Sequence, residues 1–187
     1  MKAPYFFGYG SLVNRDTHQY GDTHPARLTG WRRVWRHTDL RALAYLTIEP
    51  DPHCEIEGLI AHVPDGDWAA LDERERAYDR IDANHAVSHP KPAAIDVATY
   101  TVPKGKHGAP DTEHPVLLSY VDTVVQGYLR EFGEAGVARF FATTHGWSAP
   151  MLNDRAAPRY PRYEPVSEAA IDLVDEGLHQ QQATLIT

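Results

Sequence analysis

The sequence predicts one α+β domain over residues 1–187, with a sheet from its first half and helices from its second half. Three observations support this fold class. Apolar and polar residues alternate in short segments before about residue 102, as in half-buried strands. From Val116 onward the apolar residues recur at helical spacing. Strands that precede helices in this way favour α+β architecture over alternating βαβ units.

The first expected strand is the aromatic run at residues 5–7, which ends in the bend Gly8-Tyr9-Gly10-Ser11. Residues 14–20 are polar and would form one or two helical turns. Further strands are expected at residues 27–38, 42–48, 54–63 and 95–101. The connections between them are a turn at Pro50-Asp51-Pro52, a loop at residues 83–92 and a turn-rich segment at residues 104–115.

A short helix is expected over residues 68–78, with Asp67 as its N-cap. An apolar stripe then predicts a longer helix over residues 117–132, which Gly133 breaks. A second, shorter helix follows and closes near Gly146.

The C-terminal part of the chain is expected to be mostly helical. Residues 154–165 form an irregular segment rich in Arg, Tyr and Pro. Ser167 is expected to cap the last helix, so that residues 168–187 form a terminal helix and a frayed tail.

The composition is that of an ordinary globular protein, and it excludes several function classes. Of the 187 residues, 42% are apolar and 24% are charged, and the net charge of −8 argues against broad affinity for nucleic acid or anionic membranes. The single cysteine, Cys54, rules out an internal disulfide and fits a reducing compartment. No apolar run is long enough to span a bilayer. With no signal peptide visible before the first strand, we expect a cytoplasmic protein.

The bend after the first strand is the first candidate functional element. Glycines on both sides of Tyr9 let the backbone expose its N–H groups and let a ligand approach closely. Successive N–H groups in such a bend form a concavity that suits a carboxylate or a developing oxyanion. An isolated Gly-x-Gly-Ser is more commonly a tight turn after a strand, so a functional interpretation needs a second feature.

That second feature is Glu75, in the helix expected at residues 68–78. Spacings of three, four and three residues place it on one helix face with Trp68, Leu71 and Tyr78. A carboxylate held among aromatic groups has its charged form desolvated, which raises its pKa. A group that titrates near neutrality can both take and give a proton, as a general acid and base must. The competing interpretation is a glutamate at the helix end that reaches water.

Together, these two stretches resemble the γ-glutamylcyclotransferase-like superfamily. Phe7-Gly8-Tyr9-Gly10-Ser11-Leu12 is similar to its N-terminal signature, and Leu71-Asp72-Glu73-Arg74-Glu75, followed by Tyr78, looks like its catalytic-glutamate segment. The strand expected at residues 54–63 lies between them, where the family has one. The resemblance covers about the first 100 residues. Leu12 after the serine is closer to the glutathione-specific branch.

The resemblance implies a small mixed β-barrel with flanking helices. It also implies an enzyme that cyclises a γ-glutamyl compound to 5-oxoproline and releases an amine or an amino acid. By position, Glu75 would be the catalytic acid and base. The substrate-binding residues would be Phe7, Gly8, Tyr9, Gly10, Ser11, Leu12 and Tyr78. The expected partner is a small γ-glutamyl substrate, with no cofactor and no metal.

Three other interpretations compete with this one. Ser11 would be a nucleophile, but the sequence around it is not G-x-S-x-G and singles out no histidine as its base. His85 and His89 have the i,i+4 spacing of metal ligands, but Pro90 disfavours a helix at His89. The strongest alternative without catalysis is a ligand-binding or regulatory domain on the same fold, since a fold does not fix activity.

The leaving group and the oligomeric state stay open, a homodimer included. The irregular segment contains Arg155, Arg159 and Arg162, together with Tyr160 and Tyr163. These residues would make a second anion contact or a lid, or they would clamp the C-terminal helix or lie in a subunit contact. We interpret this segment as structural and assign no site residue to it.

Overall fold

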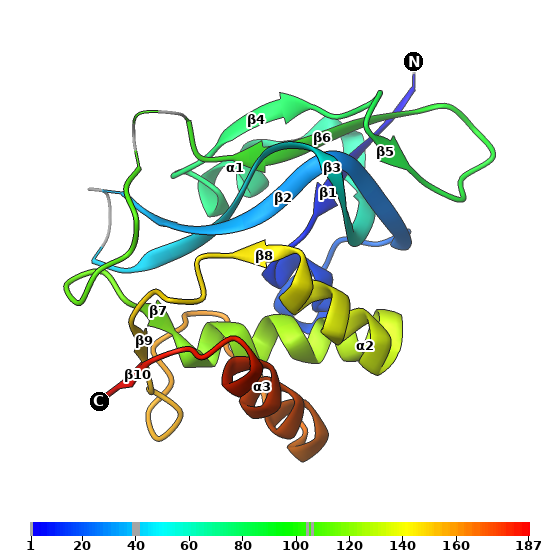
Figure 1. Ribbon diagram of the computed structural model, residues 1–187. Coiled ribbons are helices and arrows are strands. Elements are labelled where there is room, and N and C mark those ends of the chain that lie inside the picture. The colour runs from blue at the N-terminus through cyan, green and yellow to red at the C-terminus, as the bar shows by residue number, and fades with distance from the viewer. Residues whose placement is uncertain (1, 39–41, 104, 106) are drawn as a thin grey trace.

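A computed structural model describes residues 2–38, 42–103, 105 and 107–187 of the chain. Within these residues, a mixed seven-stranded sheet has the strand order β4-β6-β1-β3-β2-β5, with β8 paired to β2. Its strands are β1 (Ala3–Gly8), β2 (His24–His37), β3 (Ala44–His62), β4 (Asp79–Asp82), β5 (Val87–Ser88), β6 (Ile95–Thr101) and β8 (Thr144–His145). The sheet curls into an open half-barrel (Figure 1). The predicted α+β class and barrel-like mixed sheet are therefore confirmed.

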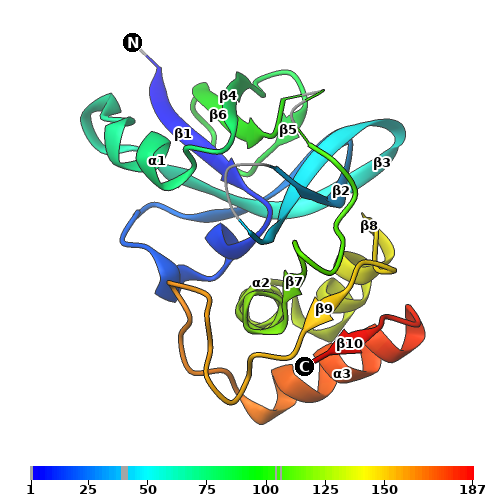
Figure 2. The ribbon, with the colours of Figure 1, turned by 90° about the vertical axis from the view of Figure 1, so that its left-hand side faces the viewer.

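The helices lie in two places. Helix α1 (Ala69–Arg74) lies near β1 and β4, whereas α2 (Leu118–Ala142) and α3 (Glu168–Gln180) lie together on the other side (Figures 1 and 2). In the described ranges, a small parallel sheet joins β7 (Val116–Leu117), β9 (Met151–Leu152) and β10 (Leu185–Ile186). Short 3-10 turns occupy Ser11–Val13, Arg15–Thr17 and Pro64–Gly66. No helix in the described part of the chain has the length and apolar character that a membrane crossing needs.

Strand β1 is buried on both faces, which explains its unbroken apolar run. Tyr5 and Phe7 belong to the main core, which also contains the apolar side chains of α2 and α3. Phe6 belongs to a second, smaller cluster with Leu71 of α1. The bend that follows β1 therefore lies where these two cores meet.

Strand β3 runs through Pro50-Asp51-Pro52, where the sequence predicted a turn, so the two strands expected on either side are one. The register of β2 against β3 shifts between Thr29 and Trp31, at Gly30 with a φ of 83°. Proline has no N–H to give to a regular ladder. Because this bulge interrupts the ladder opposite the prolines, β3 continues instead of turning.

Two segments that the sequence predicted as irregular carry short strands. The loop expected at residues 83–92 contains β5, where Val87 pairs with Leu28 of β2. The tail that was expected to fray returns as β10, and Leu185 pairs with Met151. Each strand has only two residues, and its partner lies far away in the sequence, so no local pattern indicates it.

Helix α1 is shorter than the helix expected at residues 68–78. It ends at Arg74, and the Tyr78 N–H donates to the Glu75 carbonyl oxygen at 2.7 Å, which turns the chain toward β4. Glu75 is thus the C-cap residue, and the single helical face predicted to carry Glu75 and Tyr78 does not exist. The predicted N-cap, Asp67, lies one residue too early, because Trp68 is the N-cap residue and its side chain makes no capping hydrogen bond. The Asp67 carboxylate still accepts from the Ala69 N–H at 3.0 Å, just before the helix.

Two predictions about the later helices are confirmed. The long helix breaks at Gly133, which has a φ of 66° and a ψ of −173° inside α2. Ser167 caps α3, because its hydroxyl accepts from the Ala170 N–H at 3.3 Å.

Candidate active site

The bend at the end of β1 is fixed by buried hydrogen bonds. The Tyr9 carbonyl oxygen accepts from Arg33 Nε at 3.0 Å and from Tyr128 Oη at 3.0 Å. Arg33 is fully buried, and its guanidinium lies 5.0 Å from the centroid of the Tyr128 ring. On the other side, the Tyr9 hydroxyl donates to the Tyr100 carbonyl oxygen at 2.7 Å. A network of this kind holds the bend in one conformation.

The two glycines of the bend permit close packing within the protein. A Cβ atom at Gly8 would lie 2.5 Å from Cβ of Leu12, and one at Gly10 would lie 2.6 Å from Oη of Tyr120. From the sequence we expected a ligand to approach this space. In the structure Leu12 and Tyr120 fill it, and Tyr120 becomes part of the surface that a ligand would meet.

Glu75 faces the bend across a small recess. Its side chain is 17% exposed, and its Oε1 lies 3.2 Å from Nε of Arg74. The turn that follows α1, rather than a helical stripe, sets the direction of this side chain. A carboxylate therefore lies opposite the bend, as the sequence analysis expected, but a different local structure brings it there.

Arg74 connects Glu75 to the bend. Its guanidinium donates to the Thr17 carbonyl oxygen at 2.9 Å, to the Thr17 hydroxyl at 3.2 Å and to Ser11 Oγ at 3.3 Å. The side chain is only 9% exposed. The sequence pattern indicated aromatic neighbours for Glu75 and gave no sign of this arginine beside it. A fixed cation beside the carboxylate holds it in place with a charge-assisted hydrogen bond.

The recess between the bend and Glu75 has a volume of about 30 Å³. It is lined by all the candidate residues, namely Phe7, Gly8, Tyr9, Gly10, Ser11, Leu12, Glu75 and Tyr78, and also by Leu46, Tyr100 and Tyr120. The structure thus brings two motifs together that lie far apart in the sequence. The role of each residue stays a prediction.

A larger cavity of about 570 Å³ adjoins the recess. The two share a wall formed by Ser11, Leu46, Glu75, Tyr78 and Tyr120. The recess alone holds about one water-sized group, since a water molecule occupies roughly 30 Å³ in the liquid. Any ligand that reaches Glu75 must therefore extend into the larger cavity.

Tyrosine side chains surround Glu75. Burial raises the pKa of the Tyr9, Tyr78 and Tyr120 phenols, and the negative charge of Glu75 adds to the rise. All three phenols therefore stay protonated at neutral pH and keep a hydrogen to donate. The Tyr78 hydroxyl donates to the Leu46 carbonyl oxygen at 3.0 Å, which fixes its ring at the wall of the recess.

The outer wall of the cavity comes from residues that the sequence analysis did not assign to the site. Arg159, Tyr160 and Arg162 of the irregular segment line it together with Tyr120 of α2. The rings of Tyr120 and Tyr160 meet edge to face at 5.0 Å. The arginines and tyrosines of this proline-rich segment were the sequence signal for a role in the site. Only the folded chain shows that they border this cavity.

The structural interpretation of the same segment is correct for Arg155. Its guanidinium pairs with Asp122 of α2 and with Asp175 of α3, both at 2.7 Å. Arg155 therefore clamps the C-terminal helix, while the residues after it border the cavity.

The surroundings of Ser11 do not support a nucleophile. Its Oγ accepts from Arg74, and an arginine cannot remove a proton at neutral pH. His18, the next histidine along the chain, uses its ring nitrogens on the Leu12 carbonyl oxygen and the Tyr20 N–H. Among the described residues, neither Arg74 nor His18 can therefore serve as the base that a nucleophilic Ser11 would need.

The half-barrel, the glycine bend at the end of its inner strand and the carboxylate opposite that bend define a cyclotransferase-like protein. The family model described as gamma-glutamyl cyclotransferase, AIG2-like, matches residues 6–119. The chain therefore belongs to the γ-glutamyl cyclotransferase, AIG2-like family. No curated protein matches the chain in sequence.

Several solved structures share the fold. One, described as a gamma-glutamyl cyclotransferase, has a TM-score of 0.57 and 17% identity over 94% of this chain and 99% of that chain. The uncharacterised protein loc79017 from Homo sapiens has a TM-score of 0.56 and 16% identity, with the same coverage of 94% and 99%. YkqA from Bacillus subtilis has a TM-score of 0.57 and 19% identity over 78% of this chain and 57% of that chain. At these identities the likeness shows the fold alone.

Proposed function

We propose that this protein cyclises the γ-glutamyl group of a small substrate to 5-oxoproline and releases the attached amine or amino acid. The observation that carries the proposal is the position of Glu75, whose side chain faces the bend and borders both the recess and the cavity. Membership of the γ-glutamyl cyclotransferase, AIG2-like family supports the same reaction class.

The reaction needs one proton to move between two nitrogens. The α-amine of the substrate attacks its own γ-carbonyl carbon and forms a ring, and the bond from that carbon to the leaving nitrogen then breaks. Glu75 takes the proton from the attacking nitrogen and gives it to the leaving nitrogen, so the enzyme ends in its starting state. Because the nucleophile is tethered, the protein mainly selects the folded conformer of the substrate.

The groups around Glu75 suit the negative charge that develops on the γ-carbonyl oxygen of such a substrate. The hydroxyls of Tyr9 and Tyr78 already donate to the carbonyl oxygens of Tyr100 and Leu46. The protonated phenol of Tyr120, which borders both the recess and the cavity, would therefore donate to the oxyanion that develops on the γ-carbonyl. The backbone of Ser11 lowers the pKa of the Tyr120 phenol, although burial outweighs this effect.

The leaving group would occupy the larger cavity. Its outer wall contains the guanidinium-bearing side chains of Arg159 and Arg162. Arginine pairs well with a carboxylate because its planar donors match the two oxygens. We therefore propose that the leaving group carries an acidic function, as an amino acid or a short peptide does, rather than being a simple alkyl amine.

The first test is to incubate the protein with γ-glutamyl amino acids, peptides and amines and to measure 5-oxoproline. We expect product from the wild-type protein, and we expect Glu75→Gln to lower turnover by about 10²–10⁴, since it removes the proton carrier. Substrate binding, measured by calorimetry, should persist in this variant.

A matched control is Glu73→Gln, because Glu73 borders the same cavity but is 75% exposed and pairs with Arg76. Its turnover should stay close to that of the wild type. Near-native 5-oxoproline release by Glu75→Gln would refute the assignment of the proton carrier. Binding without product from every compound would favour the ligand-binding alternative.

A second test concerns the leaving group. The double variant Arg159→Ala/Arg162→Ala should raise KM about tenfold or more for a γ-glutamyl amino acid, because each lost charge-assisted hydrogen bond contributes about 1.5–3 kcal/mol. KM for a γ-glutamyl alkyl amine should stay the same. Equal changes for both substrates would show that the two arginines act on the cavity as a whole and do not bind a carboxylate.

A further inference from the structure

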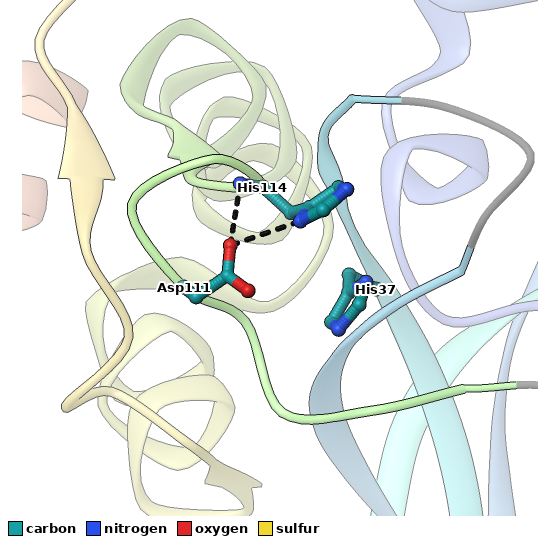
Figure 3. Close-up of side chains that lie close together, drawn as sticks. All are labelled: His37, Asp111 and His114. Atoms are coloured by element: carbon teal, nitrogen blue, oxygen red, sulfur yellow. Dashed lines mark hydrogen bonds and ion pairs between the residues drawn. The ribbon is translucent and has the colours of Figure 1, made fainter.

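Three side chains form a cluster away from the recess and cavity. They are His37 at the end of β2, and Asp111 and His114 in the connection between β6 and β7 (Figure 3). One possible ligand atom from each lies within 4.8 Å of the others. The imidazole rings of His37 and His114 lie one above the other, with centroids 4.3 Å apart and planes inclined by 20°.

The backbone holds each member of the cluster in place. His37 exchanges two backbone hydrogen bonds with Gly108, at 3.0 and 2.9 Å, which ties β2 to the connection. Oδ1 of Asp111 accepts from the backbone N–H groups of Glu113 and His114, at 3.0 and 2.9 Å. A site whose backbone is already ordered loses little entropy when an ion binds.

Each of the three side chains offers a possible ligand atom to the cluster. Nδ1 of His37 is buried and has no hydrogen-bond partner among the described residues, which is unusual for a polar atom. Nδ1 of His114 lies 2.9 Å from Oδ1 of Asp111. The second carboxylate oxygen of Asp111 lies on the side of the His37 ring (Figure 3).

We propose that His37, Asp111 and His114 bind a divalent transition-metal ion of the zinc type. Two imidazoles and one carboxylate suit Zn²⁺, Co²⁺ or Ni²⁺, whereas Mg²⁺ and Ca²⁺ prefer oxygen ligands. Zinc–ligand bonds are about 2.0–2.2 Å long, so the three atoms must move inward by rotation of their side chains. His114 would bind through Nδ1 and carry its proton on Nε2. Three protein ligands leave the fourth position to water.

A bound ion would join the β6–β7 connection to the β2–β3 hairpin beside the cavity. His37 pairs with Ala44, whose N–H donates to the Pro115 carbonyl oxygen at 3.0 Å, and Ala44 borders the cavity. The ion would therefore stabilise one rim of the cavity without touching Glu75. From the sequence we expected no metal, and only His85 and His89 had the spacing of metal ligands. Because the ion would not touch Glu75, this site is independent of the proposed reaction.

The test is a calorimetric titration of the full-length, metal-free protein with Zn²⁺ and with Mg²⁺. We expect one Zn²⁺ per chain and no response to Mg²⁺. Separate His37→Ala and His114→Ala variants should each weaken Zn²⁺ binding by at least about 100-fold, because even an outer partner of a metal ligand changes affinity by 10–100-fold. Co²⁺ should give the visible spectrum of a site with nitrogen ligands in the wild type only.

A matched control is His85→Ala/His89→Ala, which removes two histidines elsewhere and should leave Zn²⁺ binding unchanged. Circular dichroism would confirm that each variant is folded, and His114→Gln provides a milder second variant. The proposal is overturned if the wild-type protein takes up no Zn²⁺. It is equally overturned if folded His37 and His114 variants bind the ion as the wild type does, or if the control variant alone loses it.

Discussion

His18 lies behind the bend, and two hydrogen bonds select its neutral form. Its Nε2 lies 3.0 Å from the Leu12 carbonyl oxygen, and its Nδ1 accepts from the Tyr20 N–H at 3.2 Å. One ring nitrogen must therefore donate and the other must accept, which only a neutral imidazole can do. Burial lowers the pKa of His18 from 6.5 to about 4, and the positive charges of Arg74 and Arg15 act in the same direction.

This lowered pKa predicts how stability depends on pH. In the unfolded chain His18 takes up a proton as the pH falls below about 6.5, but in the folded protein it does so only near 4. The unfolded state thus binds more protons across this window, and its free energy falls relative to the folded state. We expect the free energy of unfolding to decrease from pH 6.5 to pH 4, and His18→Gln to reduce that decrease. Urea titrations at several pH values would measure the free energy of unfolding of both proteins. If this free energy falls equally with pH in the wild type and in His18→Gln, the prediction is wrong.

At the scale of elements, the break in α2 depends on a backbone conformation that favours glycine. Gly133 has a φ of 66° and a ψ of −173°. No atom lies within 4 Å of the place where a Cβ would be added, so space is not the constraint. The constraint is the torsion angle, which costs an L-residue about 1–3 kcal/mol.

Gly133→Ala should therefore lower the free energy of unfolding by about 1–3 kcal/mol. Gly21→Ala is the matched control, because Gly21 also has open space around it but lacks a positive φ. That change should stay within about 0.5 kcal/mol of the wild type. Chemical denaturation would measure both variants, and equal effects would mean that the break tolerates a side chain.

Elements with a strong local pattern could be predicted from the sequence. The aromatic run of β1, the alternation of β6 and the helical stripe broken at Gly133 each depend on neighbouring residues. The path of β3 through Pro50 depends on a bulge in the opposite strand, and β10 depends on β9. Such pairings lie far apart in the sequence, which is why local patterns failed there.

In the candidate site, too, local motifs could be predicted from the sequence, whereas contacts between distant segments could not. The bend and Glu75 each belong to a short motif, so both could be named before the fold was known. Tyr120 and Arg159 come from elements that only the folded chain brings to the cavity. The contact between Arg74 and Glu75 could not be derived either, because the helix ends at Arg74 and the turn after it sets the direction of Glu75.

At the scale of the whole molecule, Arg155 holds three parts of the chain together. It comes from the segment that borders the cavity, and it pairs with Asp122 of α2 and Asp175 of α3. The Asp122 side chain is 1% exposed, while that of Asp175 is 56% exposed. Burial raises the pKa of Asp122, and the guanidinium of Arg155 opposes the rise. Removing the arginine would leave a buried carboxylate without its counter-charge.

Arg155→Met should therefore destabilise the protein by roughly 3–5 kcal/mol, as expected when a buried ion pair loses one partner. Asp175→Asn removes only the exposed pair and should cost less than about 1 kcal/mol. Thermal and denaturant unfolding would measure the loss of stability in each variant. Similar small losses in both variants would show that Asp122 finds another partner.

The segment that forms the outer wall of the cavity is anchored at both ends. At its start, Asp154 accepts from the Ser119 N–H at 2.8 Å, and at its end the Ser167 N–H donates to Gln126 at 2.7 Å. The residues between these anchors lie beyond the 6–119 region that matches the family model. Replacing this segment between its two anchors would therefore reshape the outer wall of the cavity while the bend and Glu75 keep their positions.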